Sequence, residues 1–77
     1  MNKARRKMLE GIINNLELQK ESLESVCEEE QEAYDNLPEG IQYSERGEAM
    51  SDNVNDMESV ASDLEDIITT LQEVLER

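Results

Sequence analysis

The sequence predicts an all-α protein, an antiparallel two-helix hairpin that packs like a coiled coil. Along two long segments, apolar residues recur in alternating steps of three and four, and the only Pro of the chain lies between these segments. Such steps place residues on one face of a helix, whereas a strand repeats every two residues. With 77 residues, the chain is expected to form a single domain over residues 1–77.

The first helix is expected over about residues 2–37. It should end by Leu37, because Pro38 disfavours an α conformation in the residue before it. The residues that recur in these steps form a column along one face of the helix, and Ile13 and Cys27 are expected to flank this column. The column itself consists of Leu9, Ile12, Leu16, Gln19, Leu23, Val26, Glu30, Ala33 and Leu37.

The turn is expected over residues 38–44, which contain the only Pro and one of the three Gly. Ser44 can cap the second helix with its hydroxyl group. Glu45 and Glu48 would then lie in the first turn of that helix, where the helix dipole favours anions.

The second helix is expected over about residues 45–76, and its column is apolar throughout. A further apolar column, Val60, Ile67 and Val74, runs beside it at sevenfold spacing. One neighbouring helix cannot cover a stripe this wide. We therefore expect these three residues and Ile13 to form an oligomer interface, in a dimeric four-helix bundle or a higher oligomer. The main column consists of Met50, Val54, Met57, Ala61, Leu64, Ile68, Leu71 and Leu75.

Acidic residues dominate the composition, since 20 Asp and Glu against 7 Lys and Arg give a formal net charge of −13. Direct binding of nucleic acid is not expected, because phosphates require a basic surface. Residues 1–9 carry four basic side chains and no acid, whereas residues 28–58 carry eleven acids against Arg46 alone. A hairpin should bring the basic end near Glu73 and Glu76, and it should gather the eleven acids around the turn.

The acidic end has two interpretations. Acids keep a small oligomer soluble, and salt screens exposed charges over about 8 Å. Alternatively, the acidic end is a docking surface for a basic groove of another protein, because complementary potentials speed association and select the partner.

Catalysis is not expected from this composition. With no His, one Cys and three Gly, the chain lacks the commonest general base, an all-thiolate zinc site and a glycine-rich phosphate loop. The acidic segment Asp52–Asp56 lacks the central Gly of a calcium loop, and Cys27 lies among acids that disfavour a thiolate. We expect no metal, no cofactor, no membrane segment and a cytoplasmic protein.

The region around the turn is a candidate recognition patch. It holds both aromatic residues and the only cation of the acidic half, beside a helix N-terminus with free amide donors. The alternative is structural. The polar residues would cap helices, the aromatic residues would cover the end of the contact between the two helices, and the cation would relieve repulsion among the nearby acids. The candidate binding residues are Tyr34, Asn36, Gln42, Tyr43, Ser44 and Arg46.

The segments Glu29–Gln42 (EEQEAYDNLPEGIQ) and Ser44–Met50 (SERGEAM) resemble a family of small acidic proteins encoded by bacterial phages and prophages. The likeness extends over the whole chain, although Gly40 stands where a serine is common in that family. The resemblance implies a role inside a bacterial host and carries over no catalytic residue. Small non-enzymatic phage proteins of this kind often act by stoichiometric binding.

Three functional hypotheses follow. The first is a non-enzymatic homo-oligomer that binds a host protein with a basic surface through the acidic turn end, inhibiting defence or regulation. The second is an oligomeric sponge for a nucleotide immune signal, with Arg46, Ser44, Tyr34 and Tyr43 gathered at an oligomer interface. The third is a purely structural assembly module.

Overall fold

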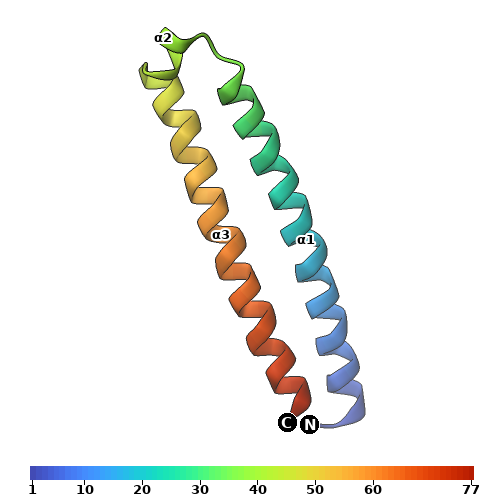
Figure 1. The fold of residues 1–77 in the computed structure, drawn as a ribbon. Helices are drawn as coiled ribbons and strands as arrows, with labels where there is room; N and C mark the ends of the chain where they lie inside the picture. The colour runs from blue at the N-terminus through green and yellow to red at the C-terminus, as the bar shows by residue number, and fades with distance from the viewer.

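The computed structural model describes all of residues 1–77 and contains only helices and short connections. The elements in order are α1 (Lys3–Asp35), α2 (Glu39–Gln42) and α3 (Glu45–Glu76). The two long helices run side by side in opposite directions, with both chain ends at one end and α2 at the other (Figure 1). The all-α prediction is confirmed, and α1 and α3 pack together as a hairpin with Cα extents of 58 × 15 × 13 Å.

Helix α1 begins and ends with side-chain caps. At its start, the Asn2 side chain accepts a hydrogen bond of 2.8 Å from the Arg5 backbone N–H. At its end, the Gln42 amide donates to the Tyr34 carbonyl at 3.1 Å and to the Asp35 carbonyl at 3.5 Å. The Tyr34 carbonyl also accepts from the Leu37 N–H at 3.1 Å, so the Gln42 amide adds a second donor at the end of the helix, where carbonyl groups have no partner one turn ahead.

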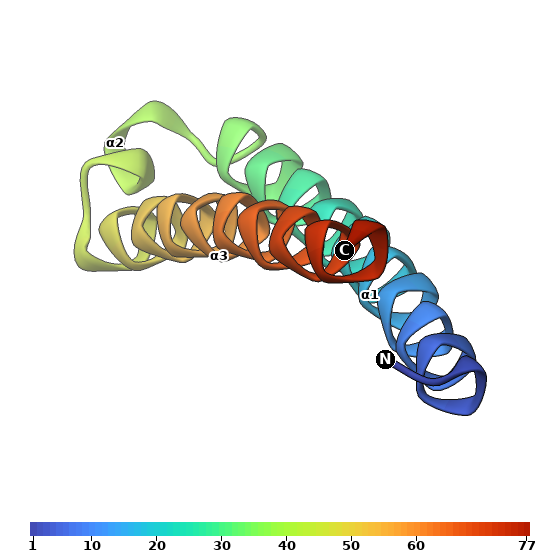
Figure 2. The same cartoon turned by 90° about the horizontal axis from the view of Figure 1, so that it is seen from below.

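The turn contains the four-residue helix α2, which the sequence did not predict. Pro38 starts it, and its carbonyl accepts hydrogen bonds from the N–H groups of Ile41 and Gln42. Figure 2 shows α2 beside the start of α3. The approach is close, because a Cβ atom added at Gly47 would lie 2.1 Å from the Gln42 carbonyl oxygen.

The seam between the long helices confirms the predicted column of α3 and corrects that of α1. Every member of the α3 column is buried or half-buried, and Val54 and Ile68 are buried. On α1, Ile13 is 5% exposed and lies in the seam, whereas Ile12 is 50% exposed beside it. The predictions that Ile13 and Cys27 flank the seam, and that Ile12, Gln19, Val26 and Ala33 lie in it, are therefore wrong. The α1 seam residues are Arg6, Leu9, Ile13, Leu16, Lys20, Leu23, Cys27, Glu30 and Tyr34, and Leu37 follows in the connection.

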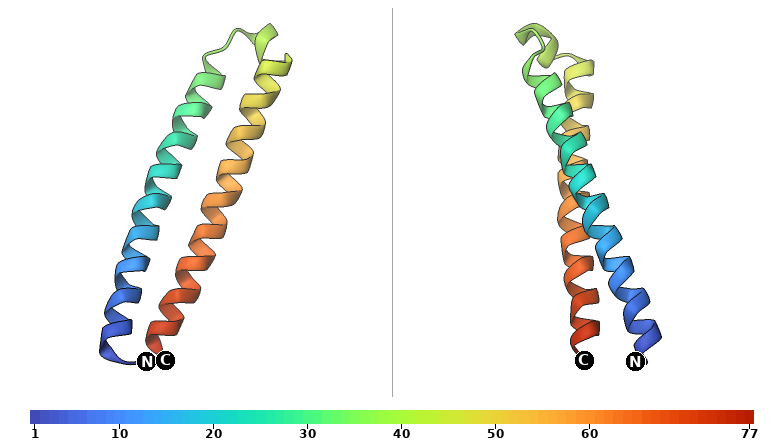
Figure 3. Two further views of the ribbon diagram at one scale, coloured as in Figure 1. Left: turned by 180° about the vertical axis from the view of Figure 1, so that it is seen from behind. Right: turned by 90° about the vertical axis from the view of Figure 1, so that its right-hand side faces the viewer.

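Polar contacts across the seam align the two helices. The Lys20 ammonium lies 2.8 Å from a Glu65 carboxylate oxygen, and the Asn53 amide donates to Glu30 at 2.9 Å. Because a shift along the seam would separate both pairs, they favour one register. The two helices cross at a shallow angle along this seam (Figure 3).

The basic end of α1 lies beside the last turn of α3, as expected for a hairpin. There the Arg6 guanidinium donates to the Leu75 carbonyl, and neither Glu73 nor Glu76 forms an ion pair. Arg6 thus supplies the positive charge that the α3 C-terminus lacks in its own last turn. Neither long helix has a stretch apolar enough to cross a membrane.

Candidate functional site at the turn end

The hairpin has two unlike sides, which we call the apolar face and the acidic face. Val26 of α1 and Asn53 of α3 line one groove, and Glu24 of α1 and Glu58 of α3 line another. Residues at sevenfold spacing share a helix face. The apolar face therefore contains Ile12, Gln19, Val26 and Ala33 of α1 with Asn53, Val60, Ile67 and Val74 of α3.

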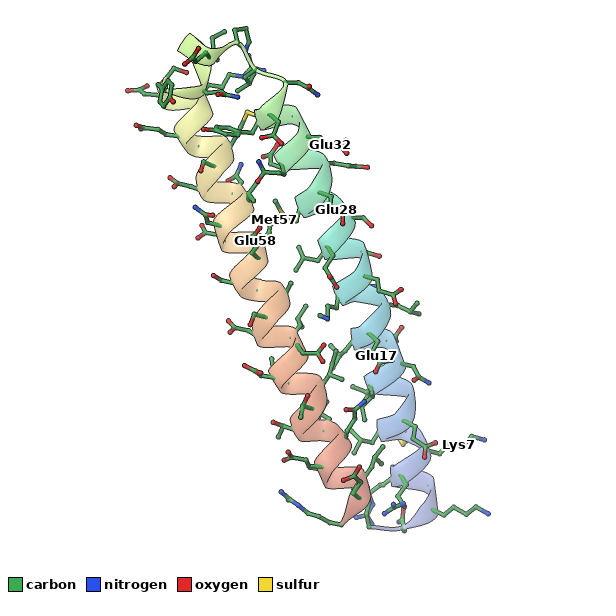
Figure 4. The ribbon with its side chains drawn as sticks, viewed as in Figure 1. Lys7, Glu17, Glu28, Glu32, Met57 and Glu58 are labelled. Carbon is green, nitrogen blue, oxygen red and sulfur yellow. The ribbon has the colours of Figure 1, made fainter.

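The acidic face lies on the other side of the seam. Glu28 and Glu32 of α1 and Glu58 of α3 line one groove on this face (Figure 4). Further toward the chain ends, Glu65 of α3 forms an ion pair with Lys20. The two faces therefore differ in chemistry.

A groove at the turn, which we call the turn groove, collects three of the six candidate binding residues. It has a volume of about 400 Å³ and lies between the end of α1, α2 and the first turns of α3. Tyr34 is half-buried, whereas Tyr43 is 76% exposed. Tyr43 therefore does not cover the end of the seam. The lining residues are Tyr34, Gln42, Tyr43, Glu48, Ser51 and Asp52.

The other three candidates lie outside the turn groove. Asn36 is the C-cap of α1. Ser44 is the N-cap of α3, as predicted, and its hydroxyl accepts from the Gly47 N–H at 3.5 Å and donates to the Ile41 carbonyl. Arg46 is exposed and forms no ion pair. Two of these residues thus have structural roles.

Glu48, Ser51 and Asp52 complete the turn groove, although the sequence did not single them out as binding residues. Their spacing of three and four places them on one face of α3. That signal was present in the sequence. It becomes informative only when α2 fixes which face of α3 lies next to Tyr43.

The carboxylates of the turn end have almost no cationic partners within the chain. Lys20 forms the only ion pairs, with Glu24 and Glu65. Glu48 and Asp52 in the turn groove are therefore free to accept hydrogen bonds from an external cation. The exposed Tyr43 ring adds a surface on which a guanidinium or ammonium group can stack.

Cys27 is half-buried in the seam, where its thiol lies 3.6 Å from the Val54 carbonyl oxygen. Burial raises the pKa of the Cys27 thiol, and the nearby charges of Glu58 and Glu28 raise it further. A raised pKa lowers the thiolate fraction at neutral pH, so this side chain suits packing better than nucleophilic attack. No group of three or more metal-ligating side chains is assembled in the structure.

The expected oligomer interface is only partly available on the surface. Val60 and Ile67 are each 49% exposed on the apolar face, and Val74 is half-buried at its end. Ile13 is 5% exposed and buried within the hairpin, so it is not available on the surface, whereas the neighbouring Ile12 is 50% exposed.

Comparison with known proteins gives no family for this chain. No protein-family model matches it, and neither curated proteins nor solved structures give a significant match.

Proposed function

We propose that the protein is a non-enzymatic binding protein of phage or prophage origin that engages a basic surface of a host protein through the turn groove. One observation carries the proposal: the turn groove combines an exposed Tyr43 with the carboxylates of Glu48 and Asp52, and no cation of the chain pairs with either acid. Aromatic anchors beside uncompensated charge are typical of binding surfaces for oppositely charged partners. Stoichiometric occupation of a basic host groove would block that groove for its usual ligand.

The sequence resemblance to small phage proteins supports the biological setting of this proposal. The lining of the turn groove favours a cationic partner over a nucleotide signal, because a phosphate would meet the carboxylates of Glu48 and Asp52. Arg46, the one cation near the turn, lies outside the groove.

The binding role is tested by affinity capture from a bacterial lysate with three immobilised variants beside the unaltered protein. Tyr43→Ala removes the aromatic anchor, and Asp52→Lys reverses a charge in the turn groove. Asp63→Lys makes the same charge change on an exposed part of α3 outside the groove. We expect a host protein that the unaltered chain and Asp63→Lys retain and that the two groove variants lose.

Titration calorimetry with the purified host protein then measures the stoichiometry, which should be one binding site per hairpin. Retention of the same proteins by all three variants would contradict the proposal. A nucleotide released when the natively purified protein is denatured, and detected by mass spectrometry, would instead support the sponge hypothesis.

We further propose that two hairpins assemble through their apolar faces into a four-helix bundle. Only Ile13, Val54 and Ile68 form the buried apolar core of a single hairpin, which is small for a chain of 77 residues. On the apolar face, by contrast, Ile12, Val26, Val60 and Ile67 are about half exposed. A second copy would remove this apolar surface from water.

A further inference from the structure

A second groove near the turn, which we call the seam groove, lies on the apolar face. It has a volume of about 450 Å³ and is lined by Val26, Glu29, Glu30, Asn53, Asp56 and Met57. Glu30 accepts a hydrogen bond from Asn53, but none of the three carboxylates has a cation beside it. The seam groove is therefore both apolar and negatively charged, and it fits a segment that combines apolar and basic side chains.

The other end of the same face carries such a segment. Arg6 and Ile13 both lie in the seam, seven residues apart. Arg5 and Ile12 each come one residue earlier. They therefore share one helix face, which is the apolar face. Met8 lies between them and is 69% exposed. Arg5 is exposed and forms no ion pair within the chain.

We infer that the occupant of the seam groove is a second copy of this chain, packed antiparallel so that its Arg5, Met8 and Ile12 enter the groove. This inference rests on the proposed assembly and gives it a direction. In a two-fold dimer with the turns at opposite ends, each copy supplies one basic segment and one seam groove, and both contacts form at once. The arrangement with both turns at the same end would bring the two acidic ends together, and like charges oppose it.

The size of the apolar face agrees with this arrangement. The hairpin extends 58 Å in its longest direction and 15 Å in the next, so one long side offers an area of the same order as the ~800 Å² per partner that a standard interface buries. Acidic side chains are concentrated on the opposite face, where Glu24, Glu28 and Glu58 lie. The turn groove and the seam groove share no lining residue.

Charge reversal tests whether the basic segment and the seam groove meet. At low salt, Arg5→Glu and Glu29→Lys should each weaken dimerisation about tenfold by sedimentation equilibrium, because each replaces an attraction with a repulsion. The double variant should recover most of the affinity. Lys7→Glu is the matched control, because Lys7 carries the same charge but extends away from α3 (Figure 4). Equal weakening by Lys7→Glu, or no recovery in the double variant, would overturn the contact.

A spin-label distance tests the direction independently of the contact. Cys27→Ala removes the native thiol, and Gly40→Cys places a single label at the turn, where nothing lies within 4 Å of an added Cβ atom. An antiparallel dimer should give an inter-label distance that approaches the 58 Å length of the hairpin. A distance under about 25 Å would overturn the inference, since packed helices lie only 8–10 Å apart.

These two measurements separate the inference from the proposals on which it rests. A dimer with a short inter-label distance would contradict the direction and leave the assembly intact. A monomer in sedimentation equilibrium would contradict the assembly and this inference together, whereas binding of a host protein at the turn groove would be unaffected.

Discussion

Gly47 is the residue at which a single added carbon changes the geometry of the turn. Its Cα lies against the end of α2, so that a Cβ atom would meet the Gln42 carbonyl oxygen at 2.1 Å and the Ile41 carbonyl oxygen at 2.6 Å. Both neighbours are backbone atoms, which cannot rotate away as a side chain would. The two other glycines, Gly11 and Gly40, have open space where a Cβ atom would lie.

We expect Gly47→Ala to lower the free energy of unfolding by about 1–3 kcal/mol, the usual effect of overpacking, or by more if α2 detaches from α3. Gly11→Ala, in the exposed interior of α1, should raise it by about 0.8–1 kcal/mol through helix propensity. Urea unfolding followed by circular dichroism measures both. Equal stability changes in the two variants would show that α2 does not pack against Gly47.

Cys27 gives a second prediction at the residue scale, through its raised pKa. The folded chain favours the protonated thiol, so we expect iodoacetamide to alkylate Cys27 more slowly in the folded protein than in urea at the same pH. The midpoint of the rate against pH should lie above the ordinary value of 9.0 in the folded protein. A midpoint below that value would show that burial next to Glu58 and Glu28 does not control the ionisation of this thiol.

The same pKa shift has a consequence for stability. Because the pKa is higher in the folded state, the contribution of Cys27 to stability is fully present below the unfolded pKa and is lost as pH rises through the folded one. The free energy of unfolding should therefore fall more steeply above pH 9 than it does in Cys27→Ala, which serves as the control.

At the scale of the elements, α3 was predictable from periodicity and α1 was predictable only in part. The α3 column has an apolar residue at every step from Met50 to Leu75, whereas the second column, Val60, Ile67 and Val74, occupies only the last half of the helix. On α1, a step of three from Leu9 reaches Ile12 and a step of four reaches Ile13. The same steps from Leu23 reach Val26 and Cys27, so two columns fit the same pattern. The contacts with α3 decide between them, and no pattern within α1 alone contains that information.

Helix α2 and the capping of α1 explain why part of the candidate site could not be predicted. A four-residue helix leaves no periodic signal, and the role of Gln42 as a donor to the Tyr34 and Asp35 carbonyls depends on how α2 turns back. Gln42 resembled a binding residue in the sequence because it is polar and near the turn. The structure gives it a structural role as well as a place in the turn groove.

We expect Gln42→Ala to lower the free energy of unfolding by about 0.5–1.5 kcal/mol, because the end of α1 loses its side-chain donor. Gln31→Ala is the matched control. Its amide bonds only the exposed Asp35 side chain one turn away, a contact that contributes about 0.2–0.5 kcal/mol. Thermal unfolding of both variants gives the comparison, and an equal effect would exclude a capping role for Gln42.

The whole molecule is a hairpin whose two faces differ in chemistry. The acidic turn end and the wide apolar stripe were both visible in the sequence, because charge and heptad spacing are local properties. The arrangement of the apolar face and the acidic face on opposite sides of one seam was not visible, since it depends on the rotation of α1. That rotation moves Ile12 to the surface and Ile13 into the seam.

A substitution on the apolar face and another outside it test the assembly of two hairpins. We expect Ile67→Glu to weaken dimerisation by at least tenfold, because burial of such a side chain contributes about 1.5–3 kcal/mol. Leu18→Glu adds the same charge at a side chain that is 59% exposed and lies outside the apolar face. Sedimentation equilibrium should show normal dimerisation for Leu18→Glu, and equal loss in both variants would indicate a charge effect alone.

The elongated shape of the hairpin affects how its mass must be measured. The radius of gyration is 17.4 Å, whereas a compact chain of this length has a value of about 11.5 Å. A rod of this kind tumbles and diffuses like a heavier sphere. A single hairpin would thus elute from a gel-filtration column early enough to be mistaken for a dimer. The oligomeric state must therefore be determined by a method that measures molar mass directly.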